Sequence, residues 1–389
     1  MHILFISDGY NRYGAPRSMK QLIENLLRYC PDLEISVVLL YRSDTEEYYR
    51  RLGCKTYKVF YGPYYQGIPG KRWKLPIKVI LTGIEYLIGR AAGAYWLSKK
   101  LDMTSVDIIH ANSSREDLGA ILALKYKKPF VWHIREFGLG CFSFRKDYIN
   151  LMNQAASELI AVSEAAREHW IKKGLEKEKV VCIYNGVPLE IPEKKDYEGN
   201  LKKQIRFLML GSIYEAKGQY QIIQALGMLE ERHKEKISLD IVGDGPGEYV
   251  NRLRKLAKQY GLLSHISFLG YQEGFDHKIC SYDCGIMCSR TEGFGRVTAE
   301  YMMAGLPVIA SDIGPNRELV IDQETGLLYE WNNIEDLKEK IIFLLNNVDL
   351  LEKMGRRARE YAAAHFTSKR NAELIYKEYL KILDRKHAL

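Results

Sequence analysis

Short runs of Ile, Val and Leu alternate along most of the chain with longer stretches whose apolar residues recur at helical spacing. Such runs are typical of strands that are buried on both faces of a parallel sheet. The pattern therefore predicts an α/β fold made of two series of β-α units. The expected strands of the first series are 2–7, 34–40, 55–60, 106–111, 129–134, 158–162 and 179–184. Those of the second series are 205–210, 237–242, 266–268, 283–288, 307–310 and 327–329.

The segment from Pro188 to Gln204 interrupts this alternation, since it is dense in Glu and Lys and has no buried-strand run. A chain of 389 residues is also longer than one ordinary core supports. We therefore expect two doubly wound, Rossmann-like domains, with ligands beyond the carboxyl ends of the strands and in the cleft between the domains. The expected parts are an N-terminal domain (1–187), a linker (188–204), a C-terminal domain (205–366) and a final amphipathic helix (367–389) that returns to the N-terminal domain.

The segment 289–300 carries the most informative chemistry, because it follows an expected strand and opens an expected helix. Gly293 and Gly295 allow the backbone to approach a ligand closely. The amides of Gly295, Arg296 and Val297 fall at the helix start, where N–H groups and the helix dipole suit a diphosphate. This segment therefore predicts an anion-binding site.

Two carboxylates flank this helix start. Glu292 precedes the helix, and Glu300 lies about one turn inside it. One can accept hydrogen bonds from sugar hydroxyls and the other from a ribose. A capped helix with a surface glutamate is the alternative interpretation, but position, glycines and spacing together favour a ligand site.

Segment 289–311 resembles the signature of the family-four retaining glycosyltransferases of the GT-B fold, in which two glutamates are separated by seven residues, as Glu292 and Glu300 are here. The resemblance covers almost the whole chain, and it implies sugar transfer from a nucleotide-activated donor. Further segments that resemble the family lie at 133–136, 161–164, 184–188, 211–218, 242–246 and 269–271.

The resemblance also implies roles for single residues. Glu292 would face the transferred sugar, and Glu300 would bind the ribose hydroxyls. Lys217 would neutralise the donor phosphates, and His133 would contact the donor sugar near the reacting centre. The other positions that the resemblance places around the donor are Gly14, Gly211, Ser212, Gly243, Tyr271 and Phe294.

Taken from the residues alone, His133 has two interpretations. It ends an expected strand, where ligands bind, and Arg135 and Glu136 follow it. A lone histidine is also a common packing or capping residue. His110 ends a neighbouring expected strand and has a similar but weaker claim.

One position departs from the family pattern. Many members carry an Arg directly after the glycine that aligns with Gly211, and here that residue is Ser212. Arg296, beside the same helix start, is expected to supply the missing charge. Since no D-x-D motif of the metal-dependent type stands out, we expect no metal cofactor, and Lys217 and Arg296 would stabilise the leaving group instead.

The net charge of +8 is concentrated between Lys71 and Lys100, where seven basic residues face one acid, Glu85. Aromatic and aliphatic residues, Trp96 among them, are mixed with these cations. This mixture suits a surface that rests on anionic lipid, and a core helix with solvated lysines fits it equally well. No nucleic-acid-binding motif accompanies the charge, so we expect no nucleic-acid partner.

The seven cysteines are scattered, and no C-x-x-C occurs. We expect buried free thiols and not a metal site. The chain begins with an expected strand and not with a signal peptide, and no apolar run approaches the roughly 20 residues of a membrane span. The expected location is therefore the cytoplasm, at the inner face of the membrane if 71–100 binds lipid.

These observations favour a hexosyltransferase that uses a nucleotide sugar, and the resemblance implies that it retains the configuration. A UDP-sugar is expected although no residue specifies the base. The basic segment 71–100 favours a lipid-linked glycan acceptor, as in bacterial surface polysaccharide assembly. Two other classes stay open. One is a catalytically silent nucleotide-sugar-binding subunit of a partner transferase, which Ser212 supports, and the other is a nucleotide-sugar epimerase on the same fold.

Overall fold

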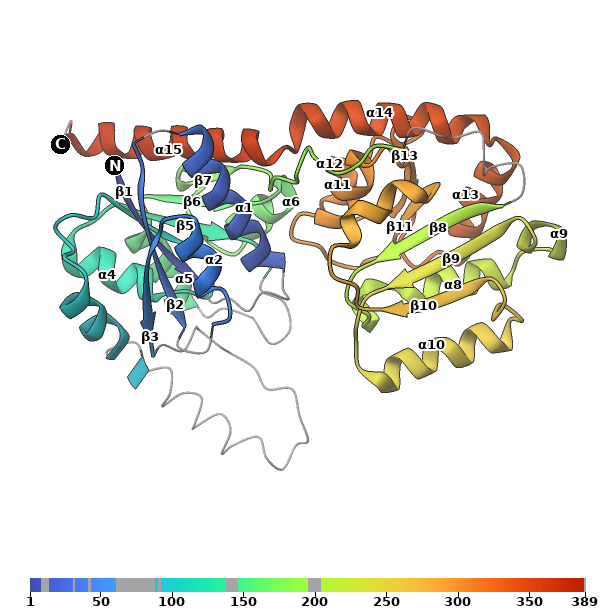
Figure 1. The fold of residues 1–389 in the computed structure, drawn as a ribbon, viewed down its shortest axis with the longest axis horizontal. Coiled ribbons are helices and arrows are strands. Elements are labelled where there is room, and N and C mark those ends of the chain that lie inside the picture. The colour runs from blue at the N-terminus through green and yellow to red at the C-terminus, as the bar shows by residue number, and fades with distance from the viewer. Residues whose placement is uncertain are drawn as a thin grey trace. The chain divides into compact units, whose positions relative to one another are not determined.

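The computed structural model divides the chain into two compact units (Figure 1). The first contains Met1–Gly186 and Ser368–Leu389, and the second contains Val187–Thr367. Each unit is an α/β fold built on one parallel sheet. The structure describes residues 1–7, 14–30, 32–40, 43–60, 88–89, 92–137, 146–194 and 204–387.

Within these ranges the first unit has a seven-stranded sheet in the order β3-β2-β1-β4-β5-β6-β7, and neighbouring strands run parallel. Its strands are β1 (His2–Ser7), β2 (Glu34–Leu40), β3 (Lys55–Val59), β4 (Ile108–Ala111), β5 (Phe130–Ile134), β6 (Glu158–Ala161) and β7 (Val180–Cys182). Its helices are α1 (Gly14–Tyr29), α2 (Glu46–Arg51), α4 (Leu118–Tyr126), α5 (Lys146–Ala155), α6 (Glu164–Lys172) and α15 (Ser368–His387), with a short 3₁₀ turn η2 (Lys177–Lys179).

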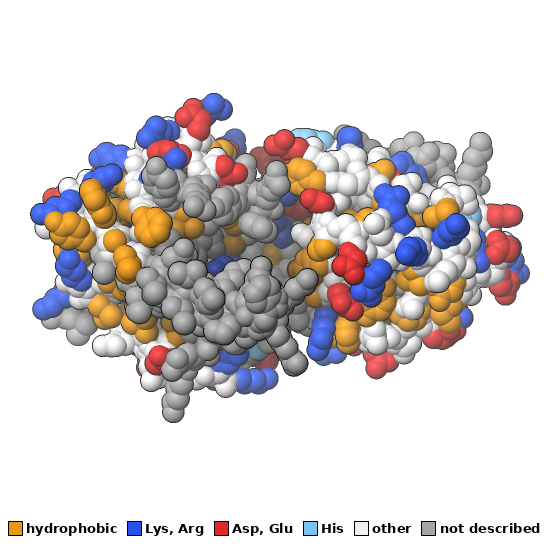
Figure 2. Space-filling model, turned by 90° about the horizontal axis from the view of Figure 1, so that it is seen from below, with side chains coloured by type: hydrophobic (Ala, Val, Ile, Leu, Met, Phe, Trp, Pro, Cys, Tyr) orange, Lys and Arg blue, Asp and Glu red, His pale blue; other side chains and the backbone are white. Residues whose placement is uncertain are grey.

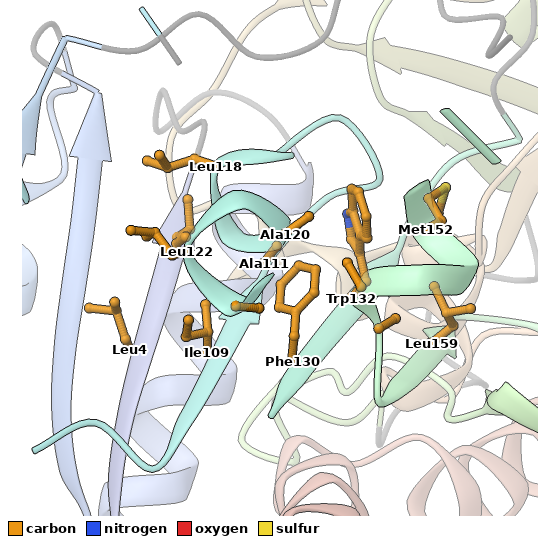
Figure 3. Close-up of a cluster of buried hydrophobic side chains, with 14 of the residues drawn as sticks. Leu4, Ile109, Ala111, Leu118, Ala120, Leu122, Phe130, Trp132, Met152 and Leu159 are labelled. Carbon is orange, nitrogen blue, oxygen red and sulfur yellow. The ribbon is translucent and has the colours of Figure 1, made fainter. Parts of the chain in front are cut away.

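Alternate side chains of the strands fill the two faces of this sheet. Ile3 and Phe5 of β1 point to one face, and Leu4 and Ile6 point to the other, as the period of a strand requires. Residues of α1, α2 and α15 cover the first face, and residues of α4, α5 and α6 cover the second. Figure 3 shows side chains of β1, β4 and β5 meeting those of α4 on this second face.

The C-terminal helix α15 is part of the first unit and packs against α1 (Figure 1). Ala372, Ile375 and Tyr379 on its inner face are fully buried in the same cluster as Ile3 and Phe5. The predicted return of the last helix to the N-terminal domain is therefore confirmed. It completes the hydrophobic cover of the sheet.

The second unit contains, in its described residues, a six-stranded parallel sheet in the order β10-β9-β8-β11-β12-β13. Its strands are β8 (Ile205–Leu210), β9 (Ile237–Val242), β10 (Ile266–Gly270), β11 (Cys284–Met287), β12 (Val308–Ser311) and β13 (Gly326–Tyr329). Its helices and 3₁₀ turns are η3 (Glu215–Lys217), α8 (Gln219–Gly227), α9 (Glu231–Lys234), α10 (Gly247–Gln259), η4 (Phe275–Ser281), α11 (Arg296–Met303), α12 (Asn316–Leu319), α13 (Ile334–Asn346) and α14 (Asp349–His365).

Every strand that the hydrophobic runs predict is present in these two sheets, with ends that differ by two residues at most. The buried cysteines of the second unit are also where the pattern places them. Cys284 lies in β11 and Cys288 follows it, both as free thiols without exposure. In the described part of the chain no helix has the length and apolar character of a membrane span.

The described part of the expected linker, residues 188–194 and 204, belongs to the second unit. Val187 is buried and forms a parallel bridge with Thr367. Lys194 forms an ion pair of 2.9 Å with Asp283, and the two side chains are only 3% and 1% exposed. The chain thus enters the second unit at Val187, before the segment that is dense in Glu and Lys.

This buried ion pair generates a stability prediction. We expect Lys194→Ala to lower the free energy of unfolding of the second unit by about 3 kcal/mol, because the change leaves the Asp283 carboxylate buried without its cation. Urea unfolding followed by a probe in the second unit measures the change. The control is Arg356→Ala, which removes an ion pair whose side chains are 66% and 37% exposed and should cost less than about 1 kcal/mol. Equal losses in the two variants would contradict the prediction.

Candidate functional site

The strand order of the second sheet brings two loops to the same place. After β8 the chain adds β9 and β10 on one side, and β11 then pairs with the other side of β8. The loops that follow β8 and β11 therefore start from neighbouring strands at the carboxyl edge, where doubly wound sheets bind ligands. These loops contain 211–218 and 288–295, the two segments that carry the strongest chemical signals in the sequence.

Backbone contacts hold these two loops together. Gly218 has a φ of +70°, and a Cβ at this position would lie 2.3 Å from the carbonyl oxygen of Cys288. The amide of Arg290 donates a hydrogen bond of 2.8 Å to the carbonyl oxygen of Ala216. Because the backbones touch, Gly218 has a structural requirement for glycine that is independent of any ligand.

A third loop, after β9, joins the first by the same kind of contact. Gly243 has a φ of +150°, and a Cβ there would lie 1.8 Å from the carbonyl oxygen of Gly211. The amide of Ile213 donates to the carbonyl oxygen of Asp244 at 2.8 Å. Gly243 thus lets its loop approach the loop of Gly211, whose own φ of +137° favours glycine. Ser212 is exposed on the first of these loops.

The lysine and the first glutamate of the expected donor site form an ion pair. The Nζ atom of Lys217 lies 2.5 Å from Oε1 of Glu292, and the two side chains are 21% and 15% exposed. Burial disfavours the Lys217 ammonium, but the charges of Glu292 and Tyr214 outweigh this effect and raise the pKa of Lys217 above its ordinary value. Lys217 is therefore a cation at neutral pH, held next to the carboxylate that the sequence assigns to the sugar.

Helix α11 begins directly after this pair. Gly295, its N-cap residue, has a φ of +85°, and among the described residues no side chain forms a cap hydrogen bond there. Within the helix, the Nε atom of Arg296 lies 2.9 Å from Oε1 of Glu300, and the side chains are 11% and 1% exposed. The guanidinium that we expect to replace the missing cation at 212 is therefore engaged by the carboxylate that we expect on the ribose. Val297, in the first turn, is half-buried.

Two further expected positions differ in how they present their side chains. Phe294 is 3% exposed, and its ring packs edge to face against Phe366 at a centroid distance of 5.7 Å. The side chain of Phe294 is thus part of the core, and the place of this residue in a donor site stays a prediction. Tyr271 projects from the loop after β10 and is exposed. Gly293 lies between Glu292 and Phe294 and is half-buried.

In the first unit, Gly14 is the first residue of α1, and a Cβ there would meet no atom within 4 Å. Packing therefore gives no reason for glycine at this position. The preceding loop, 8–13, lies outside the described residues. His133 is the last residue but one of β5, next to the carboxyl end of the strand, and its side chain is fully buried. Its role toward the donor sugar stays a prediction.

His133 is part of a buried polar chain. The hydroxyl of Tyr379 lies 2.6 Å from Nδ1 of His110, and Nε2 of His110 lies 3.2 Å from Nδ1 of His133. Nη2 of Arg135 lies 3.3 Å from the same Nδ1 atom. Burial, followed by the charge of Arg135, lowers the pKa of both histidines well below the ordinary range, and both are neutral at pH 7.

Sequence reasoning noted His110 only from its place at a strand end, and it missed Tyr379 entirely. Tyr379 is 269 residues away from His110 in the chain, on a helix whose pattern shows only an apolar face. No local signal marks a tyrosine on such a face as the partner of a particular histidine. The predicted return of the last helix to the N-terminal domain indicates only that some residue of this helix lies near the first sheet, and not which one contacts His110.

The described part of the basic segment forms an exposed aromatic surface. Ile88, Tyr95 and Trp96 are 60%, 57% and 57% exposed. Lys99 and Lys100 lie over the rings of Tyr95 and Trp96, at 5.7 and 5.9 Å. Figure 2 shows one face of the molecule, on which hydrophobic and basic side chains lie next to each other over the first unit. The residues from 61 to 87 lie outside the described part of the chain, and so does most of the segment 71–100.

Metal ligands do not gather in the part of the chain that the structure describes, where no group of three or more His, Cys, Asp or Glu side chains has the geometry to hold an ion. The described site contains two ion pairs, one helix start and three loops with glycines.

Two family models match the chain one after the other. Residues 19–191 match the model described as Glycosyltransferase Family 4, and residues 190–361 match the model described as Glycosyl transferases group 1. An uncharacterised glycosyltransferase of Methanocaldococcus jannaschii is 30% identical over 289 residues, 69% of this chain and 71% of that protein. Another from the same organism is 28% identical over 360 residues, 87% of this chain and 88% of that protein.

Among solved structures, the Anabaena protein Alr3699/HepE in complex with UDP is similar with a TM-score of 0.81 and 20% identity, covering 98% of this chain and all of that chain. The same Anabaena protein in complex with UDP-glucose gives a TM-score of 0.76 at 20% identity, covering all of both chains. At this identity the likeness establishes the fold, which is the predicted two-domain GT-B arrangement of Rossmann-like units.

The neutral histidines generate a prediction on pH dependence. Their pKa values are lowered in the folded state and return to about 6.5 on unfolding. The unfolded chain therefore binds protons below this pH while the folded chain does not. The two histidines therefore do not lower the free energy of unfolding of the first unit above about pH 6.5. Below this pH they lower it by up to about 1.4 kcal/mol per pH unit for each histidine.

Urea unfolding of the first unit between about pH 7.5 and pH 5.5 measures this slope. His110→Phe preserves the stacking of this ring on Phe5, which has a centroid distance of 4.7 Å, and should reduce the slope by the share of one histidine. A slope that is unchanged in His110→Phe would contradict the prediction.

Proposed function

The chain belongs to the glycosyltransferases described by the group 1 and family 4 models, and from this we propose that it moves a sugar from a nucleotide-sugar donor to a glycan or lipid-linked glycan, with retention of configuration. The observation that supports this most directly is the Lys217–Glu292 pair, which joins the loops after β8 and β11. The cation suits the diphosphate and the carboxylate suits the sugar, the two groups that a sugar–diphosphate bond joins.

The diphosphate binds Lys217 and the amide end of α11. A diphosphate carries more negative charge than one carboxylate, so it competes with Glu292 for the Lys217 ammonium. Glu292 then accepts hydrogen bonds from hydroxyls of the transferred sugar, and Glu300, held by Arg296, binds the ribose. A UDP-sugar is the favoured donor, and the complexes of the Anabaena protein with UDP and UDP-glucose support this choice.

The transfer proceeds without a metal ion. Cleavage of the sugar–phosphate bond builds negative charge on the leaving diphosphate and positive charge at the anomeric carbon. Lys217 and the helix amides stabilise the first charge, in a part of the site that is largely removed from water. No residue stands out as a nucleophile for double displacement, so the acceptor attacks from the face that the diphosphate leaves.

A second candidate function is a nucleotide-sugar-binding subunit without catalytic activity. Two observations favour it: Ser212 stands where many relatives carry Arg, and the Arg296 guanidinium is paired with Glu300. With Lys217 as the principal cation on the diphosphate, the leaving group is stabilised less than it would be by two cations. Binding of a nucleotide sugar without turnover under all acceptor conditions would select this function.

The acceptor side contacts an anionic membrane. Ile88, Tyr95 and Trp96 are exposed beside Lys99 and Lys100, which is the composition of an interfacial surface. A lipid-linked glycan at the inner face of a membrane, in bacterial surface polysaccharide assembly, is the acceptor that fits this surface. Anionic headgroups would bind the lysines while the aromatic rings enter the headgroup region.

The donor site is tested by a matched set of variants. We expect Glu292→Gln to reduce kcat by about 100-fold or more, because a neutral amide stabilises the developing positive charge less well. Lys217→Ala should weaken UDP binding by about tenfold and also reduce kcat. Released nucleotide, measured for a panel of UDP- and GDP-sugars with and without a bacterial lipid extract, reports the reaction. Glu324→Gln, an exposed acid far along the chain, is the control, and activity of Glu292→Gln equal to that control would contradict the proposal.

The membrane surface is tested by cosedimentation with vesicles of phosphatidylglycerol and phosphatidylcholine. We expect the protein to pellet at low salt and to be released at high salt, since the attraction is screened. Trp96→Ala combined with Lys100→Ala should reduce the bound fraction at least about threefold. Leu124→Ala, which removes an exposed apolar side chain on α4, should not change it. A parent protein that stays in the supernatant at low salt would remove the membrane proposal.

A further inference from the structure

Three buried polar side chains, linked by hydrogen bonds, connect α15 to the sheet of the first unit. The hydrogen-bonded series runs from the Tyr379 hydroxyl through the two ring nitrogens of His110 to Nδ1 of His133. All three side chains are fully buried, and they come from α15, β4 and β5. Hydrogen bonds in such surroundings are not exchanged with water, so their direction has to be consistent from one end to the other.

Arg135 determines which atom donates and which accepts in each of these hydrogen bonds. A guanidinium is always protonated and has no acceptor, so its contact with Nδ1 of His133 requires that nitrogen to accept. Nε2 of His110, which faces the same Nδ1 atom, must then carry a proton and donate it. Since His110 is neutral, its Nδ1 atom has no proton and accepts the hydrogen bond from the Tyr379 hydroxyl.

The same logic fixes the far nitrogen of His133. This ring is also neutral, so with Nδ1 as an acceptor its single proton lies on Nε2. Nε2 of His133 is buried and has no hydrogen-bond partner among the described residues. A buried N–H group without an acceptor is costly, and an oxygen atom of a bound ligand would satisfy it.

The groups that hold His133 are themselves rigid. The His110 ring stacks on Phe5 with a centroid distance of 4.7 Å and an interplanar angle of 28°. Arg135 donates from Nε to the carbonyl oxygen and side-chain oxygen of Asn112, at 3.0 and 2.9 Å, and its Nη1 atom binds Asn185. The orientation of His133 is therefore fixed by residues of several elements and not by its own strand alone.

We propose that Tyr379 and His110 are positioning residues that, together with Arg135, hold His133 as the Nε2–H tautomer, so that His133 offers a hydrogen-bond donor, and no lone pair, to an oxygen of the sugar donor. The last step of this inference rests on the proposed function. A neutral donor can bind a hydroxyl oxygen without placing a positive charge next to the anomeric carbon. Because Nε2 has no lone pair, His133 does not act as base or nucleophile, and the proton of the acceptor hydroxyl leaves by another route.

The direct test is the protonation state of the ring nitrogens in the full-length protein, labelled with ¹⁵N-histidine and observed by long-range ¹H–¹⁵N correlation. Signals are assigned with His110→Phe and His133→Asn variants. We expect both histidines to carry the proton on Nε2 near neutral pH, and the Nε2 signal of His133 to shift when UDP-glucose is added as a probe. A proton on Nδ1 of His133, or a doubly protonated ring, would overturn the proposal.

Tyr379→Phe tests the positioning role. Loss of the hydroxyl leaves Nδ1 of His110 without its donor, while Arg135 still holds Nδ1 of His133 as an acceptor. We therefore expect a mixture of tautomers at His110, a weakened hydrogen bond from His110 to His133, and a decrease in kcat of about fivefold with an unchanged KM for the acceptor. Tyr376→Phe removes a hydroxyl from the same helix that does not belong to the hydrogen-bonded series Tyr379–His110–His133. It should leave the tautomers and kcat as in the parent. A slower Tyr379→Phe enzyme whose tautomers match the parent would show that Tyr379 acts by packing alone, and the positioning role would be rejected.

The tautomer measurement does not depend on turnover. If no nucleotide sugar is consumed and the ring nitrogens are protonated as expected, the proposed function fails while the positioning role of Tyr379 and His110 is supported. If sugar transfer is observed and the Nδ1 atom of His133 carries the proton, the function stands and the positioning role is wrong.

Discussion

The parallel pairing of the strands is the constraint on which the rest of the structure depends. In each unit every strand runs in the same direction as its neighbours, so all the loops that follow strands collect at one edge. The order of pairing then selects among these loops, because the chain reverses its progress across the sheet once, beside β8 in the second unit and beside β1 in the first. The Lys217–Glu292 pair is a direct result, since its members follow the two strands at that point.

Close backbone contact is what makes the second-unit loops rigid enough to carry charge. The glycines at 211, 218 and 243 lie where neighbouring loops touch through backbone atoms. Two opposite charges with 21% and 15% exposure need such support, because their attraction is useful only if the geometry is maintained without water. The glycine pattern and the ion pair are therefore two parts of one arrangement, and the resemblance to a nucleotide-binding loop follows from both.

The sequence predicts the fold well because its strongest signal, short apolar runs between helical segments, is local. Each expected strand is present, and so is the returning helix α15. The candidate site is predicted less completely. The segment 289–300 identifies Glu292 and Glu300, but pairing across loops decides what each carboxylate touches, and this is why Arg296 binds Glu300 and Phe294 faces the core. Tyr379 has no local signal at all, since its role depends on a contact with His110 made through tertiary packing.

Helix α15 contributes both to the core of the first unit and to the hydrogen bonds of His110, although its sequence pattern indicates only the first. α15 completes the hydrophobic cover of the first sheet with Ala372 and Ile375, which is reason enough for its amphipathic pattern. The same face carries Tyr379, and a hydroxyl inside this apolar contact is stable because His110 accepts its proton in a hydrogen bond. Arg135 fixes the proton of His133 on Nε2, and the hydrogen bond from Tyr379 keeps His110 in the tautomer that matches it. Core packing of α15, a helix of 20 residues, thus supports the hydrogen-bonding character of a strand residue that the resemblance places at the reacting sugar.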